Sequence, residues 1–75
     1  MKWVELYRMA LKRPVALDTL ANHGIAALES SRKGVRRVAS GGRIGDLYFL
    51  CVLLDTHAIA LPDSVVRCIQ LAAGL

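Results

Sequence analysis

Residues 45–58 read GDLYFLCVLLDTHA, and the structure of this stretch decides the fold class of the chain. Apolar residues recur in it at helical spacing, and a buried helix can be apolar on nearly every side. These residues are Leu47, Leu50, Leu54 and Ala58. The stretch also holds side chains that suit a buried strand, namely Tyr48, Phe49, Cys51 and Val52. This segment alone is therefore compatible with either a helix or a strand.

The choice between helix and strand depends on what flanks the stretch. As a strand, RIGDLYFL at 43–50 would pair with VRRVA at 35–39 through the turn SGG at 40–42. We favour the helix because the stretch is long and the neighbouring segments are helical. The expected fold is all-α, a small bundle of about four helices in one domain spanning 1–75. The alternative is an α+β fold with a hairpin at about 35–54.

Two helices are expected before this stretch. The first covers Lys2–Arg13 and ends at Pro14, because proline cannot continue the hydrogen-bond ladder. Its apolar face consists of Trp3, Leu6, Tyr7 and Ala10. The second covers Val15 to about Ser31, with Gly24 as a weak point or a close-packing site. Its apolar side consists of Leu17, Leu20, Ala21 and Leu28, and its exposed faces carry Asp18 and Glu29.

A last helix is expected after the apolar stretch. Pro62 opens it, Asp63 suits the positive end of the helix dipole, and Gly74 is placed to cap the C-terminus. Its buried side consists of Val65, Val66, Ile69 and Ala73.

The composition is unusually apolar for so small a chain. Of its 75 residues 55% are hydrophobic, and the mean hydropathy is +0.42. Because a domain of this size buries only about 60% of its unfolded surface, we expect a partner or a second copy to cover the excess, which makes a homodimer possible. The apolar run 47–54 is too short to cross a membrane, and the N-terminus lacks a signal-peptide core. We therefore expect a cytoplasmic protein.

No arrangement of reactive side chains indicates an enzyme or a cofactor. His23, His57, Cys51 and Cys68 could supply four zinc ligands by number, but they form no CxxC or HxxxH pair. Both cysteines are expected as buried thiols in a reducing compartment. Asp46 and Asp55 could frame a site, although solvated or helix-end carboxylates are the simpler interpretation. We expect neither catalysis nor a bound metal.

The charge is concentrated in RKGVRRVASGGRIG at 32–45, which we call the basic stretch. It holds five of the ten Lys and Arg residues and no acidic residue; the five are Arg32, Lys33, Arg36, Arg37 and Arg43. Five cations on a glycine-rich backbone predict salt-dependent, largely sequence-independent contacts with DNA phosphates. An acidic protein partner and a merely solvated loop are the alternatives.

Two short motifs resemble a known family. Tyr7, Met9 and Lys12-Arg13 precede LDTL at 17–20, and Asp46 precedes LPDSVVRCI at 61–69. This order resembles the Hha/YmoA family of small nucleoid-associated gene-expression modulators. The resemblance covers about half of the chain. Where the family has acidic residues after this motif, this chain has Ala21 and Ile25, and Val66 stands in place of the family's closing tryptophan.

The resemblance implies a helical, non-enzymatic modulator of transcription that binds an H-NS-type silencer. Asp18 and Asp46 would then meet basic residues of the silencer, while the basic stretch adds DNA affinity. Such a protein would be associated with the nucleoid.

Two other functions fit the same composition. One is a small phage- or plasmid-type inhibitor or adaptor that docks on a host protein. The other is a self-associating structural domain.

Overall fold

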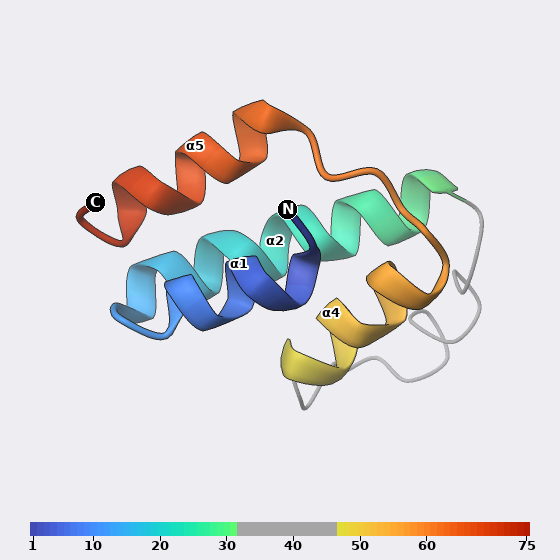
Figure 1. Cartoon of the computed structure of the whole chain (residues 1–75), viewed down its shortest axis with the longest axis horizontal. Helices are drawn as coiled ribbons and strands as arrows, with labels where there is room; N and C mark the ends of the chain where they lie inside the picture. Colours follow the sequence, from blue (N-terminus) through green and yellow to red (C-terminus); the bar gives the residue numbers. More distant parts are fainter. Residues whose placement is uncertain (32–46) are drawn as a thin grey trace.

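The computed structural model describes residues 1–31 and 47–75, and this part of the chain forms four α-helices and no strand (Figure 1). They are α1 (Trp3–Ala10), α2 (Pro14–Ser31), α4 (Leu47–Thr56) and α5 (Asp63–Ala72). The all-α prediction is therefore confirmed. The hairpin alternative is wrong for 47–54, because these residues lie within α4; its other strand, 35–39, falls outside the described residues.

The helices α1 and α2 form the centre of the molecule. A tight turn joins them, so they run in opposite directions (Figure 1). Both pack against α4 and against α5, whereas α4 and α5, among the described helices, make no contact with each other. Thus α4 and α5 cover different sides of the α1–α2 pair.

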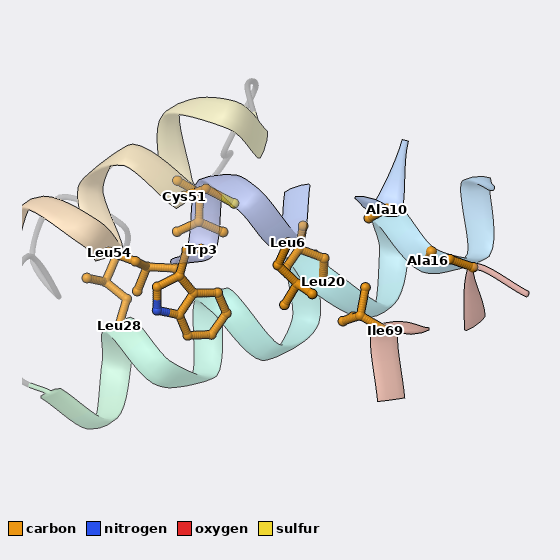
Figure 2. Packing of buried hydrophobic residues seen from close by; sticks show 11 residues of the cluster. Trp3, Leu6, Ala10, Ala16, Leu20, Leu28, Cys51, Leu54 and Ile69 are labelled. Carbon is orange, nitrogen blue, oxygen red and sulfur yellow. The ribbon is translucent and has the colours of Figure 1, made fainter. Parts of the chain in front are cut away.

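The core is apolar and draws on every described helix (Figure 2). Of the predicted face of α1, Trp3, Leu6 and Ala10 are buried, Trp3 being 1% exposed, while Tyr7 is partly buried against the core. Its buried members are Trp3, Leu6, Ala10, Ala16, Leu20, Leu28, Leu50, Cys51, Leu54, Ile69 and Ala73. Of the predicted buried side of α5, Ile69 and Ala73 are buried, while Val65 and Val66 are partly buried.

Gly24 is a point of close approach between α2 and α4. A Cβ atom added at this glycine would lie 2.8 Å from Leu50 Cδ2 and 3.3 Å from Leu54 Cδ1. Of the two interpretations of Gly24, close packing is therefore the one that applies. The absent side chain lets the leucines of α4 pack directly onto the backbone of α2.

The boundaries differ from the prediction around the prolines. Helix α1 ends at Ala10 and not at Arg13, and Pro14 is the first residue of α2. A proline suits this position because the first N–H groups of a helix have no intrahelical partner and its φ is already helical. Pro62 is the N-cap residue of α5, which begins at Asp63.

Two helices end in the same backbone motif. Gly74 has a φ of +81°, its N–H donates to the Leu71 carbonyl at 3.1 Å, and Leu75 N–H donates to the Gln70 carbonyl at 2.9 Å. This is the Schellman arrangement, so the predicted glycine cap is confirmed. After α4 the equivalent position is Ala58 with a φ of +53°, a conformation that costs an L-residue about 1 kcal/mol or more.

None of the helices in 1–31 and 47–75 has the combination of length and apolar composition that is needed to cross a membrane.

Candidate protein-binding surface

Asp55 joins the end of α4 to the start of α1. Its Oδ1 accepts a hydrogen bond from the backbone N–H of Trp3 at 2.9 Å, and its Oδ2 accepts one from Val4 N–H at 3.1 Å. The Trp3 indole Nε1–H donates to the Ile59 carbonyl at 3.0 Å. Asp55 therefore takes the place of a local N-cap side chain, and the carboxylate that could have framed a site with Asp46 has a structural role.

Asp18 lies on the outer face of α2. Its side chain is exposed, whereas Leu17 is partly buried and Leu20 is fully buried. Glu29, three helical turns further along α2, is also exposed. The predicted exposure of both acidic residues is confirmed, and Asp18 is available for contact with another molecule.

The other predicted site residues are not placed by the structure. Asp46 and the five cations of the basic stretch, which are Arg32, Lys33, Arg36, Arg37 and Arg43, all fall outside the described residues. The roles assigned to them, partner contact for Asp46 and phosphate contact for the cations, therefore stay predictions.

The charge is divided between the helices and the rest of the chain. Residues 1–31 and 47–75 contain five basic and five acidic residues, so their formal net charge is zero. Residues 32–46 contain five basic residues and one acidic residue, which accounts for the whole net charge of +4. Phosphate contacts of the predicted kind are therefore expected mainly from 32–46, since the described residues carry no net charge.

The two cysteines differ in their surroundings. Cys51 is buried in the core; burial, and secondarily the negative charge of Asp55, raise the pKa of its thiol from 9.0 to about 12. The reactive thiolate is therefore scarce at Cys51 near neutral pH. Cys68 is exposed on α5, so its predicted burial is wrong. A signal was available: Cys68 follows Arg67 and lies one helical turn after Ser64, on the polar side of an amphipathic helix.

The two histidines lie on α2 and just after α4. His23 lies partly buried on α2, and His57 follows the end of α4. Within the described ranges no group of three or more His, Cys, Asp or Glu side chains is placed to hold a metal ion.

An open groove lies between α2 and the segment that joins α4 to α5. Its volume is about 510 Å³, and its lining is mainly apolar, with His23 on one wall. The lining residues are Trp3, His23, Ala26, Ala27, Ser30, Ser31, Ile59, Ala60, Pro62 and Val65. The hydroxyl groups of Ser30 and Ser31 donate to the carbonyls of Ala27 and Leu28, one turn earlier in α2. The groove thus offers apolar contact more than polar recognition.

Apart from Met1 at the N-terminus, large apolar side chains are exposed at two places in the described residues that sequence reasoning did not identify. Tyr48 and Phe49, at the start of α4, are 45% and 56% exposed. The second set consists of Leu11 and Val15 around the α1–α2 turn, and Leu71 and Leu75 at the end of α5. The α1–α2 turn and the end of α5 are adjacent, because a Cβ atom at Gly74 would lie 3.0 Å from Arg13 Nη2. Exposed apolar surface of this kind is typical of protein-binding sites.

No protein-family model, no curated protein and no solved structure matches this chain.

Proposed function

We propose that this protein is a non-enzymatic modulator of gene expression that binds an H-NS-type nucleoid protein through Asp18 and assists DNA binding through its basic stretch. The observation that carries the proposal is the different exposure of neighbouring side chains within LDTL at 17–20. Leu17 and Leu20 pack inward, whereas Asp18 is exposed on α2. Packing alone accounts for the leucines, but it does not require an aspartate beside them.

The distribution of charge supports two separate contacts. An exposed carboxylate on a helical surface without net charge can fix the register of a basic partner, because opposite charges favour one docking orientation. The five cations of the basic stretch, by contrast, suit a phosphate backbone. A protein with both features can add DNA affinity to a silencer that it binds elsewhere.

The test separates the two contacts. Tagged wild-type protein, Asp18→Lys and Glu29→Lys are incubated with a purified H-NS-type protein after nuclease treatment, and binding is measured by titration calorimetry. Glu29→Lys is the matched control, since it makes the same charge change at another exposed position of α2. We expect Asp18→Lys to weaken binding at least tenfold and Glu29→Lys to leave it nearly unchanged, with both variants helical by circular dichroism.

The DNA contact is tested with Arg36→Glu/Arg37→Glu and a short duplex. If all five cations contact phosphates, the logarithm of the binding constant should fall with the logarithm of salt concentration with a slope of about −4 to −5. The double variant should flatten this slope. Normal binding of the silencer by Asp18→Lys would refute the partner contact, and an unchanged slope would refute the DNA contact.

A second function is favoured by the apolar side chains at the α1–α2 turn and the end of α5. Leu11, Val15, Leu71 and Leu75 are all more than half exposed on adjacent segments. A small inhibitor or adaptor would bury such residues against a host protein. It would form a one-to-one or two-to-two complex without DNA affinity, and Leu71→Asp would disrupt that complex.

A further inference from the structure

The charges of the described helices are unevenly distributed along the molecule. Residues 6–17 and 64–75 contain four of the five Lys and Arg residues in the described ranges and no acidic residue. The four are Arg8, Lys12, Arg13 and Arg67. By contrast, Glu29 lies near the far end of α2 and Asp63 begins α5, so both are remote from the α1–α2 turn. Positive charge is therefore concentrated around this turn.

The same end of the molecule exposes aliphatic side chains. It is formed by residues 11–15 and 71–75, and we call it the basic apolar end. Leu11, Val15 and Leu71 are 54%, 64% and 69% exposed. Water surrounds these side chains unless another molecule covers them, so their burial would favour binding.

The cations lie among the exposed aliphatic side chains. Lys12 and Arg13 are both exposed and follow Leu11 directly. The Arg13 guanidinium lies against the end of α5, with Nη2 3.0 Å from the position of a Cβ atom on Gly74. Figure 1 shows the α1–α2 turn and the end of α5 together at one end of the longest axis. The basic apolar end thus presents positive charge and apolar surface to the same partner.

This combination restricts the chemistry of the partner. A DNA backbone offers phosphates but no apolar region for the leucines. A standard protein interface uses roughly 20–30 residues on each side, whereas the basic apolar end, 11–15 and 71–75, has about ten. A bilayer with anionic lipids requires no matching shape, and it offers acyl chains to apolar side chains and phosphates to cations at adjacent depths.

We propose that the basic apolar end binds reversibly to the surface of a membrane that contains anionic lipids. Leu11, Val15 and Leu71 enter the boundary between headgroups and acyl chains. Lys12 and Arg13 then lie at the level of the lipid phosphates. This proposal does not rest on the modulator function, and it assigns a different partner to the residues that an inhibitor or adaptor would use.

Asp18 supplies a test of how the molecule is oriented on the membrane. It lies one turn after Val15 on α2, whereas Glu29 is three turns further from the basic apolar end. A Lys or Arg residue near an anionic surface strengthens binding about fivefold. Asp18→Lys should therefore tighten vesicle binding more than Glu29→Lys, which has the same net charge. Since Asp18→Lys is expected to weaken silencer binding, the two proposals can fail independently.

Co-sedimentation with vesicles tests the membrane contact directly. The purified, nuclease-treated full chain is mixed at about 0.1 M salt with phosphatidylcholine vesicles, either pure or containing about 30 mol% phosphatidylglycerol. Leu11→Ser/Leu71→Ser removes two aliphatic side chains without changing the charge. Phe49→Ser is the matched control, since Phe49 is 56% exposed on α4, which does not contact α5 among the described helices.

We expect the wild type and Phe49→Ser to bind the anionic vesicles alike. Leu11→Ser/Leu71→Ser should bind them at least tenfold more weakly, and the wild type should bind pure phosphatidylcholine at least tenfold more weakly. If the double variant loses its helical circular dichroism signal, Leu71→Ser alone replaces it in the comparison.

Three results would overturn the assignment. The first is a wild type that does not bind anionic vesicles, or that binds neutral vesicles equally well. The second is normal binding by Leu11→Ser/Leu71→Ser together with loss of binding in Arg36→Glu/Arg37→Glu, which would assign the lipid contact to the basic stretch. The third is a wild type that ignores vesicles but binds a protein through Leu11 and Leu71, which would make that protein the partner.

Discussion

Replacing Asp55 by alanine should destabilise the protein severely, although this residue is neither apolar nor fully buried. The change removes both acceptors of the Trp3 and Val4 N–H groups, which lie 52 and 51 residues away in sequence. Each is a hydrogen bond to a charged group, and losing an N-cap typically costs about 0.5–2 kcal/mol. Together the two bonds predict a loss of about 2–4 kcal/mol.

This loss is large relative to the whole stability of the domain. At about 0.05–0.15 kcal/mol per residue, a chain of 75 residues is stable by about 4–11 kcal/mol. The melting temperature should therefore fall by about 10–30 °C, because 1 kcal/mol corresponds to about 4–8 °C in a domain of this size. Urea unfolding followed by the fluorescence of Trp3, the one tryptophan of the chain, measures the effect directly.

Two further variants make the Asp55 experiment specific. Asp55→Asn keeps one carbonyl acceptor and should lose about half as much stability as Asp55→Ala. Glu29→Ala removes an exposed carboxylate from α2 and should change the unfolding free energy by less than about 0.5 kcal/mol. An Asp55→Ala protein with the urea midpoint of the wild type would refute the idea that α4 caps α1.

Other predictions concern packing, backbone conformation and the thiols. Gly24→Ala should leave the free energy of unfolding in urea nearly unchanged, because a gain in helix propensity of about 1 kcal/mol offsets the displacement of a leucine of α4. Gly24→Val, with its larger side chain, should lower that free energy by about 2–3 kcal/mol. Both positions 58 and 74 have a positive φ, which glycine adopts more easily than alanine. Ala58→Gly should therefore stabilise the protein and Gly74→Ala destabilise it, each by about 1 kcal/mol. Variants with the melting temperature of the wild type would contradict this. A thiol reagent should label Cys68 at pH 8 and leave Cys51 unlabelled until urea is added, and labelling of both in the native state would be inconsistent with the core. Burial raises the folded-state pKa of the Cys51 thiol to about 12. The stability that the protonated thiol contributes is therefore present below pH 9 and lost as pH rises from 9 towards 12. Cys51→Ala should reduce this alkaline loss of stability.

The helices could be predicted because their signals are local. Pro62 marks a helix start and Gly74 an end through the backbone angles that these residues permit, and Pro14 separates the first two helices, although it was expected to end the first and not to begin the second. The exposure of Asp18 also followed from helical spacing. The burial of Cys68 was predicted wrongly, because the apolar neighbours in its sequence were given more weight than its position on the polar side of α5.

Local signals in the sequence established that α1, α2 and α5 are helical, since the period of their apolar residues and the prolines act within a few residues of each other, whereas for α4 they favoured a helix without excluding a strand. Tertiary structure alone decided which side of α4 is buried, because a helix that is apolar nearly all round has no preferred inner face until α1 and α2 pack against it. It also decided the role of Asp55. A carboxylate can cap a helix 52 residues away only after the chain has folded, so no local pattern around Lys2 or Trp3 indicates that partner.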